Sequence, residues 1–555
     1  MSAPAHAPID EADYFRRGAW RRSPLGHHLW QWADTYGPST AVVDAATRLS
    51  YDELARRSDL MAQALLDHRL AEGDAVLIQL PNSWEFLAVL LGCQRVGVRA
   101  VMALMSFRQH ELTRIARTSG AKAIVVTDRF RDEDHQHIAQ SVATAADFTC
   151  PPLVVGTRVA AENIDLRPKL LGARHTGPLR RQLDRRSPDP AAGAVVLCSG
   201  GTTGEPKLVQ HTHADYEHAF RNCAQVAGVT QNTRYLAVLP VAHNFSLASP
   251  GALGVLASGG TVVMAASPAP ESALPLIEKE KITMTAIVPA VAKRWLAHLD
   301  DAPTSRPDLS TLAVVQIGGA VTPPDLAKRV GVRFGATVQQ VYGMSEGLVS
   351  MTRLDDPLDV VNATQGRPVS GFDKIRIVDA TGTDVPDGTV GELIARGASM
   401  AAGYLGHSSG RSDKTPDGWH RTGDLVRWHP SGNLVVVGRL KELVNRGGEK
   451  IAVTEVETIL CAMDGVSDAV AFAWPHPELG ECVAAAIILT QQRLRPPSVD
   501  AVKQHFRDSG VATQKAPDEL FTVSSFPLTA MGKIDRNRLR DQLLDQTRFR
   551  TRHSD

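Results

Sequence analysis

The segment SGGTTGEPK combines the residue types that bind a polyphosphate. It directly follows the apolar run AVVLC, so it begins where a buried strand is expected to end. Its glycines let the main chain approach phosphate oxygens, and consecutive N–H groups and hydroxyls can donate to those oxygens. Its lysine adds a compact positive charge. The phosphate-binding candidates are Ser199, Gly200, Gly201, Thr202, Thr203, Gly204 and Lys207.

The spacing of this segment differs from that of a Walker A loop, which requires GxxxxGK[ST]. A turn of small residues at the end of a strand is the structural alternative. The apolar strand before the segment and Lys207 after it favour phosphate binding.

A second candidate site is Tyr342-Gly343-Met344-Ser345-Glu346, which follows the strand-like VQQV. Tyr342 offers an aromatic face to a base. Glu346 offers a carboxylate to a hard cation such as Mg²⁺, which binds one or two carboxylates together with substrate phosphate oxygens. Taken alone, the motif is also compatible with a buried tyrosine and a surface glutamate. Upstream, another strand ends on three small residues that leave room for a flat ligand, namely Gly318, Gly319 and Ala320.

Two further candidates lie nearer the C-terminus. Asp424, in RTGD, can accept hydrogen bonds from both hydroxyls of a ribose, as an acidic residue does in other nucleotide folds. The alternative is an ordinary turn residue, because aspartate is common in turns. Lys533, in PLTAMGKI, lies on a glycine-containing loop, where an exposed lysine is usually only solvated.

Together these stretches resemble the adenylate-forming superfamily, which comprises acyl-CoA synthetases, peptide-synthetase adenylation domains and luciferases. SGGTTGEPK is similar to the phosphate loop of that superfamily, and four further stretches match in the same order between about Tyr51 and Arg540. The resemblance implies that ATP and Mg²⁺ are the cofactors, that Tyr342 stacks on adenine and that Glu346 binds the metal. The ATP-binding residues that it implies are Ser199, Gly200, Gly201, Thr202, Thr203, Gly204, Lys207, Gly318, Gly319, Ala320, Val341, Tyr342, Gly343, Met344, Ser345, Asp424, Arg439 and Lys533.

The same resemblance makes Lys533 the catalytic lysine. It would span the substrate carboxylate and the α-phosphate, and it would act by positioning and electrostatics while an acid oxygen displaces pyrophosphate. Lys441, in GRLKE, matches the family's hinge position, where the C-terminal domain rotates between two half-reactions. After that rotation Gly447 and Gly448 would face the active site for transfer to a thiol.

The stretch PVAHNFSLASPG resembles the aryl-acid branch, the stand-alone ligases for 2,3-dihydroxybenzoate and salicylate. By resemblance, Asn244 would hydrogen-bond the ortho hydroxyl and the carboxylate side of the acid, and Ser249 would face the ring edge. His243, a second candidate catalytic residue, would guard the pocket mouth near the thiol tunnel. The residues implied to form an apolar slot for the ring are Phe245, Ala320, Val341 and Val349.

The neutral amide of Asn244 favours an aryl acid, because amino-acid-activating relatives place an acidic residue there for the α-ammonium. The local alternative is that Asn244 and Ser249 only satisfy nearby main-chain groups. Phe245 stands where tyrosine is usual in the branch, and Ser345 where alanine is usual. A ring with extra polar groups, such as 3-hydroxypicolinate or 3-hydroxyanthranilate, therefore stays open. Salicylate-type relatives tend to carry cysteine in place of Ser249, which favours a second ring substituent.

The elements expected to position these residues have a βαβ rhythm. Short apolar runs alternate with helical patterns after about residue 50, which predicts a mostly parallel α/β sheet covered by helices. From about Phe372, KIRIVD, GELIARG and NLVVVGR predict a small antiparallel β subdomain. We expect a large N-terminal domain over 1–438 and a small, mobile α+β C-terminal domain over 439–555, and a loosely ordered excursion over 145–190.

Composition narrows the class of protein. The 555 residues carry 60 basic and 60 acidic side chains, which argues against a dominant nucleic-acid surface. The six cysteines are scattered without metal-ligand spacing, as expected for free thiols in a reducing compartment. No signal core or membrane-length apolar stretch is seen, so we expect a cytoplasmic enzyme without a membrane or nucleic-acid partner.

These observations predict a ligase that activates an aromatic carboxylic acid as aryl-AMP. It would then load the thiol of a phosphopantetheinylated aryl carrier protein in siderophore or peptide natural-product biosynthesis. Only about 20 residues follow Lys533, which leaves no room for a fused carrier. An aryl-CoA ligase that uses free CoA is the enzymatic alternative, and a nucleotide-binding regulator is the non-enzymatic one.

Overall fold

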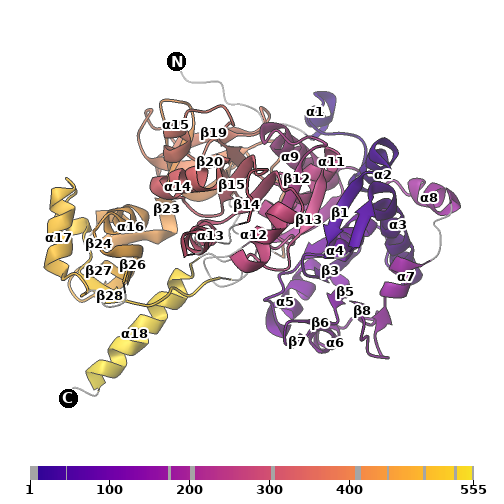
Figure 1. Cartoon of the computed structure of the whole chain (residues 1–555), viewed down its shortest axis with the longest axis horizontal. Coiled ribbons are helices and arrows are strands. Elements are labelled where there is room, and N and C mark those ends of the chain that lie inside the picture. Colours follow the sequence, from indigo (N-terminus) through magenta and orange to yellow (C-terminus); the bar gives the residue numbers. More distant parts are fainter. Residues whose placement is uncertain are drawn as a thin grey trace. The chain divides into compact units, whose positions relative to one another are not determined.

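The computed structural model divides into two compact units. The first comprises Met1–Lys374 and Ala395–His420, and the second comprises Ile375–Ile394 and Arg421–Asp555. Many elements of both units are labelled in Figure 1. The structure describes residues 11–45, 47–172, 177–199, 207–301, 307–406, 414–446, 449–491, 495–529 and 534–552.

The first unit contains a nine-stranded sheet in the order β18-β17-β16-β15-β14-β12-β13-β1-β2. The strands from β16 to β1 are parallel to their neighbours, whereas β2, β17 and β18 run antiparallel at the two edges. The parallel strands are mostly buried because both sheet faces are covered, and some of them carry buried polar residues such as Gln316, Gln339 and Gln340. The strands are β1 (Thr40–Asp44), β2 (Thr47–Ser50), β12 (Arg234–Ala237), β13 (Thr261–Met264), β14 (Met284–Ile287), β15 (Val314–Gly318), β16 (Thr337–Gly343), β17 (Val349–Met351) and β18 (Arg367–Pro368).

An eight-stranded sheet in the same unit has the order β21-β11-β10-β4-β3-β5-β8-β9. It is parallel from β10 to β9, while β11 pairs antiparallel with both β10 and β21. The strands are β3 (Ala75–Gln79), β4 (Arg99–Met102), β5 (Ala121–Thr127), β8 (Leu153–Val155), β9 (Ile164–Asp165), β10 (Gly193–Ser199), β11 (Lys207–Thr212) and β21 (Gly403–Leu405), and a separate pair is β6 (Arg129–Phe130) with β7 (Glu133–Asp134).

Helices pack against these sheets; α5 and α6, for example, both lie on β5 (Figure 1). Their starts follow local sequence: Ser50 and Glu53 form a capping box at the start of α3, and Thr212 and Asp215 form one at α9. The helices are α1 (Glu11–Arg16), α2 (Leu25–Tyr36), α3 (Tyr51–Asp67), α4 (Trp84–Arg95), α5 (Gln109–Ser119), α6 (His135–Ala145), α7 (Arg167–Leu171), α8 (Gly177–Asp184), α9 (His213–Val226), α10 (Asn244–Ala248), α11 (Gly251–Ala257), α12 (Pro270–Lys279), α13 (Pro289–Asp301), α14 (Pro324–Phe334) and α15 (Leu358–Ala363).

The expectation of a loosely ordered excursion over 145–190 is wrong. In the described part of that stretch, β8 and β9 extend the eight-stranded sheet, and α7 and α8 follow. The short run Leu153–Val155 is fully buried against β5, which anchors a segment whose composition is otherwise polar.

The second unit contains a four-stranded sheet, β19-β20-β22-β23, and a sheet with the order β25-β24-β27-β26 in which β28 also pairs with β27. Helix α16 packs on β26, and α18 packs on the same strand. The elements are β19 (Lys374–Val378), β20 (Gly391–Arg396), β22 (His420–Trp428), β23 (Leu434–Arg439), the 3₁₀ turn η1 (Leu440–Glu442), β24 (Leu443–Arg446), β25 (Glu449–Ala452), α16 (Val453–Cys461), β26 (Val466–His476), β27 (Gly480–Leu489), α17 (Val499–Asp508), η2 (Thr513–Lys515), β28 (Glu519–Thr522) and α18 (Arg536–Arg552).

The predicted fold class is confirmed: layered α/β sheets, a small β sheet and an α+β C-terminal region. The contacts group the small β sheet with the C-terminal region. A hinge boundary at 438/439 stays a prediction. Among the helices of the described residues, none is both long enough and apolar enough to cross a membrane.

Candidate functional site

Three candidate segments of the first unit lie at one edge of the nine-stranded sheet. PVAHNFSLASPG follows β12, Gly318 ends β15, and Gly343 ends β16. These strands are parallel, so their carboxyl ends lie at the same edge, where open α/β sheets bind ligands.

The predicted phosphate loop connects the antiparallel strands β10 and β11, and Ser199 pairs directly with Lys207. The loop glycines and threonines between them, Gly200, Gly201, Thr202, Thr203 and Gly204, lie outside the described residues. The Nζ atom of Lys207 lies 4.5 Å from the centre of the Tyr404 ring, within the range of a cation–π interaction. Tyr404 comes from β21, which pairs with β11.

Tyr404 also contacts the predicted metal ligand. Its hydroxyl donates to Oε1 of Glu346 at 2.7 Å, and the N–H of Ala401 donates to the Glu346 carbonyl at 2.8 Å. The next residue, Gly347, has φ of +124°, and a Cβ there would lie 1.8 Å from the Ser399 carbonyl oxygen. Only glycine permits this approach. One tyrosine thus joins the lysine of the phosphate loop to the carboxylate of the YGMSEG motif.

The surroundings of Glu346 fit a magnesium ion whose coordination shell is completed by substrate oxygens. Its second carboxylate oxygen accepts no hydrogen bond from the described residues, so it is available to a ligand. Across the described part of the chain, no group of three or more His, Cys, Asp or Glu side chains is arranged to hold a metal. A single protein carboxylate is what Mg²⁺ needs beside polyphosphate.

His211 fastens the YGMSEG motif to the start of α9. Its Nδ1 lies 2.7 Å from Oδ1 of Asp215, and its Nε2 lies 2.7 Å from the Ser345 carbonyl oxygen. A carbonyl only accepts, so Nε2 carries a proton. The other Asp215 oxygen accepts two hydrogen bonds from Thr212, as an ionised carboxylate does, so Nδ1 also donates.

His211 is therefore an imidazolium that is 1% exposed. Burial alone would lower its pKa. The charge and hydrogen bond of Asp215, the Ser345 carbonyl and the charge of Glu346 together raise the pKa above its ordinary value. This buried ion pair fixes the main chain immediately before Glu346.

Two of the residues predicted to form the apolar slot lie against Gly318. Gly318 pairs with Val341 across β15 and β16, and a Cβ on Gly318 would lie 2.5 Å from the Val341 carbonyl oxygen and 3.1 Å from Cζ of Phe245. Phe245 and Val341 are both buried. Val349 pairs with Gly343 across β16 and β17. The structure therefore brings Phe245, Gly318 and Val341 together.

Asn244 begins helix α10 and accepts a hydrogen bond at Oδ1 from the hydroxyl of Tyr216, at 3.0 Å. His243 caps that helix by accepting the N–H of Phe245 at Nδ1, at 3.3 Å. Ser249 follows the helix and is buried. Three of the residues expected near the acid thus lie on one short segment.

The remaining candidates belong to the second unit. Asp424 pairs with Arg439 across β22 and β23, and Nε of Arg439 lies 2.7 Å from Oδ1 of the buried Asp424. Lys441 lies in η1, directly after β23. Gly447, Gly448 and Lys533 lie outside the described residues.

Comparison with known proteins decides the family. The model of the "AMP-binding enzyme" family matches residues 29–405, more than half of the chain, and that of the "AMP-binding enzyme C-terminal domain" matches residues 455–533. The chain belongs to the AMP-binding enzyme family. The resemblance to the adenylate-forming superfamily is therefore confirmed.

Individual relatives of this AMP-binding enzyme are similar over nearly the whole chain. The salicylyl-CoA synthase / salicylate adenylyltransferase of a Streptomyces species is 45% identical over 96% of each chain. The 2-hydroxy-7-methoxy-5-methyl-1-naphthoate–CoA ligase of Streptomyces carzinostaticus is 42% identical over 95% of each chain. The apo structure of MbtA from Mycobacterium smegmatis is 37% identical, covers 98% of each chain and superposes with a TM-score of 0.71. The predicted aryl-acid branch and the prediction of an ATP-dependent ligase are confirmed.

Sequence reasoning missed the residues that support the AMP-binding site. Thr212-x-x-Asp215 could have been recognised as a capping box, and would have drawn attention to His211 and Tyr216 beside it. No local sequence pattern predicts the role of Tyr404, because its contact with Glu346 depends on the pairing of β21 with β11.

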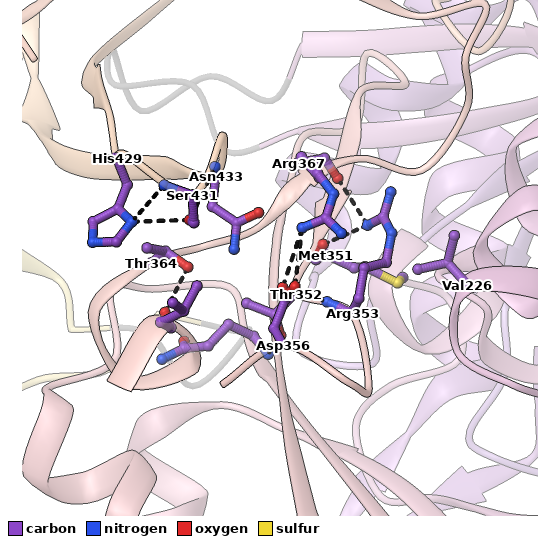
Figure 2. Close-up of polar contacts among 12 residues, drawn as sticks. Val226, Met351, Thr352, Arg353, Asp356, Thr364, Arg367, His429, Ser431 and Asn433 are labelled. Carbon is purple, nitrogen blue, oxygen red and sulfur yellow. Dashed lines mark hydrogen bonds and ion pairs between the residues drawn. The ribbon is translucent and has the colours of Figure 1, made fainter. Parts of the chain in front are cut away.

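Two neighbouring stretches, TRLDDP (352–357) and NATQGRP (362–368), hold together the edge of the nine-stranded sheet. Arg353 donates to the carbonyls of Met351, Arg367 and Pro368. Figure 2 shows Arg353 beside Met351 and Arg367, and Arg367 also lies 3.1 Å from Asp356. This network joins β17 to β18 and so braces the strand that carries Val349. Arg353 also lines a surface hollow, but none of the predicted site residues does.

Proposed function

We propose that this AMP-binding enzyme activates an aromatic acid that carries an ortho hydroxyl. The acid's carboxylate oxygen would form a bond to the α-phosphorus of ATP while the bond from that phosphorus to the departing pyrophosphate breaks. The products would be aryl-AMP and pyrophosphate. The observation that carries this proposal is the packing of Phe245 and Val341 against Gly318, with the neutral side chain of Asn244 next to Phe245 in the chain.

A slot formed by these residues would suit a planar apolar ring. Gly318 lets the Val341 main chain and the Phe245 ring approach closely, because a Cβ there would lie 2.5 Å from the Val341 carbonyl oxygen, and the buried Phe245 and Val341 side chains would supply apolar walls. Asn244 adds hydrogen-bonding capacity without charge. An α-ammonium placed there would be desolvated without a carboxylate partner, which disfavours amino acids. The two relatives named after salicylate and a 2-hydroxynaphthoate support an ortho-hydroxy acid.

Lys207 and Glu346 would serve the triphosphate, and Asp424 the ribose. Magnesium held at Glu346 would offset the negative charge of the phosphate oxygens. Lys533 would contact the acid and the α-phosphate, and Lys441 would be the hinge at which the C-terminal region rotates before transfer. Gly447 and Gly448 would then face the thiol.

The acceptor we propose is a phosphopantetheine thiol. That group terminates both a phosphopantetheinylated aryl carrier protein and free CoA, and the names of two relatives include CoA. The sulfur would attack the acyl carbon of aryl-AMP, a C–S bond would form, and AMP would leave with the oxygen that joined it to the acyl group. For the acid, salicylate, 2,3-dihydroxybenzoate and 3-hydroxypicolinate are the candidates.

Pyrophosphate exchange tests the first half-reaction. Purified enzyme with ATP and Mg²⁺ is offered salicylate, 2,3-dihydroxybenzoate, 3-hydroxypicolinate and benzoate in turn. We expect exchange with ortho-hydroxy acids above the rate with benzoate. ATP binding without exchange for any aryl acid would contradict the proposal and favour a regulator. Parallel reactions with CoA and with a phosphopantetheinylated aryl carrier protein then separate the two acceptors.

Two substitutions assign the roles. Lys533→Ala is expected to abolish exchange while ATP binding is largely kept; near-normal exchange would contradict the role of Lys533. Asn244→Ala is expected to lower kcat/KM for ortho-hydroxy acids more than for benzoate. The matched control is Asn232→Ala, an exposed asparagine in the loop before β12. Equal losses for salicylate and benzoate would contradict the contact.

A further inference from the structure

Asn244 has a defined partner on one side of its amide. Tyr216 comes from the first turn of α9, and its hydroxyl lies 3.0 Å from Oδ1 of Asn244. Its ring packs against the rings of His211 and Phe220, with centroids 5.1 and 6.4 Å away. The Tyr216 side chain is thus held in place before any acid binds.

The direction of this hydrogen bond follows from burial. Tyr216 is 1% exposed, and Asn244 is the hydrogen-bond partner of its hydroxyl among the described residues. Burial raises the pKa of Tyr216 well above its ordinary value, so the phenol keeps its proton. If Tyr216 accepted from the amide nitrogen instead, that proton would be buried without an acceptor, at a cost in free energy. Tyr216 therefore donates, and Oδ1 is the atom that receives.

The other end of the amide is left for a ligand. Among the described residues, no acceptor is bonded to Nδ2 of Asn244. Asn244 is partly exposed, and its Nδ2 is not among the buried side-chain atoms without a hydrogen-bond partner in the described part of the chain, so this nitrogen is accessible to a ligand. The adjacent Phe245 is a wall of the slot around Gly318.

We propose that Tyr216 is a positioning residue that holds the Asn244 amide with its N–H₂ group toward the acid, so that the enzyme selects acids with a hydrogen-bond acceptor at the ortho position. The inference rests on the proposed function, because it needs the acid beside Asn244. The two N–H donors of Asn244 then meet the ortho oxygen and the carboxylate. Tyr216 acts only through Asn244 and touches no reacting atom.

This arrangement discriminates between two acids of nearly the same shape. The phenolic O–H of salicylate points toward its own carboxylate, so the oxygen lone pairs remain available to Nδ2. The ortho amine of anthranilate presents N–H groups instead, and its conjugated lone pair is a poor acceptor. Donor would face donor, which leaves one of them unpaired. The enzyme is therefore expected to prefer salicylate to anthranilate and to benzoate.

Tyr216→Phe tests the inference, because it keeps the ring and removes the donor. The readout is the ratio of kcat/KM values for salicylate and anthranilate in pyrophosphate exchange by the full-length enzyme. We expect the ratio to fall about five- to tenfold, the size of one net hydrogen bond, because the amide can then turn over. The matched control is Tyr51→Phe, which removes another buried hydroxyl, bonded to the carbonyls of Leu256 and Gly260. That control should keep the parental ratio.

The outcomes separate the inference from the proposed function. If Asn244→Ala loses the ratio and Tyr216→Phe keeps it, the acid lies at Asn244 but Tyr216 does not orient the amide, and the inference is overturned. If Tyr216→Phe only lowers all rates in proportion, as a general packing defect would, the inference also fails. If even Asn244→Ala keeps the parental ratio, the acid does not contact Asn244, and the acid site assigned in the proposed function is wrong; if no aryl acid supports exchange at all, the proposed function itself fails.

Discussion

Replacing His211 with leucine removes one partner of a buried ion pair. Asp215 and the Ser345 carbonyl would each lose a bond of 2.7 Å, and Asp215 is buried from water. Removing one partner of such a pair costs about 3–5 kcal/mol. Asp215 keeps its two hydrogen bonds from Thr212, so we expect the lower end, about 3 kcal/mol.

The cost has a pH dependence whose sign follows from the raised pKa of His211. A group that is more basic in the folded state than in the unfolded one stabilises the fold fully below its unfolded pKa, near 6.5. That stabilisation is lost as the pH rises through the folded pKa. The difference in stability between the parent and His211→Leu should therefore be largest near pH 6 and smaller near pH 9.

The same change should reach the active site, because Ser345 precedes the predicted magnesium ligand Glu346. We expect KM for MgATP to rise by about tenfold to a hundredfold, as small misplacements of positioning groups do. Urea denaturation at the two pH values and pyrophosphate exchange at varied MgATP measure these effects. Equal destabilisation at both pH values, together with an unchanged KM for MgATP, would refute the reasoning.

Other parts of the site give further expectations. Tyr404→Phe removes the hydrogen bond to the Glu346 carboxylate, so the Mg²⁺ concentration needed for half-maximal exchange should rise several-fold. The KM for the acid should stay unchanged. An equal effect on the Mg²⁺ requirement and on that KM would contradict the role given to Tyr404. Burial lowers the pKa of His213 from 6.5 to about 4, so the parent should lose up to about 3 kcal/mol as the pH falls between those values. His213→Leu should remove that part of the acid loss in urea titrations; an unchanged acid profile would count against it. In Gly318→Ala the new Cβ would meet the Val341 carbonyl and Phe245, so the free energy of unfolding should fall by about 1–3 kcal/mol. Exchange and calorimetry should show that kcat/KM for aryl acids falls more than the affinity for ATP. Unimpaired aryl-acid kinetics would mean that the slot lies elsewhere.

Much of the fold follows from local sequence. The mostly apolar runs that end at Ser199 and Gly318 predict buried strands, because a strand covered on both faces carries few polar residues. The loops after β12, β15 and β16 lie at one sheet edge, because the carboxyl ends of parallel strands lie together. The prediction of ATP binding came from the family resemblance, because neither a glycine-rich loop nor a tyrosine alone identifies a nucleotide-binding site.

The contacts that depend on tertiary pairing could not be predicted. Tyr404 reaches Glu346 because β21 joins β11, a pairing between segments far apart in the chain. His211 looks like an ordinary strand residue until Asp215 and the Ser345 carbonyl surround it. The prediction of a loosely ordered excursion over 145–190 failed for a related reason. Within this largely polar stretch, the three buried residues Leu153–Val155 pair with β5 and join the sheet.

The central claim is that a carboxylate oxygen of an aromatic acid becomes bonded to the α-phosphorus of ATP. The most direct measurement uses salicylate labelled with ¹⁸O in its carboxylate, together with ATP, Mg²⁺ and a phosphopantetheine thiol, followed by mass spectrometry of the products. We predict AMP that carries one ¹⁸O atom and pyrophosphate that carries none. Label in pyrophosphate or phosphate, or AMP without label after the acid has been consumed, would contradict the account.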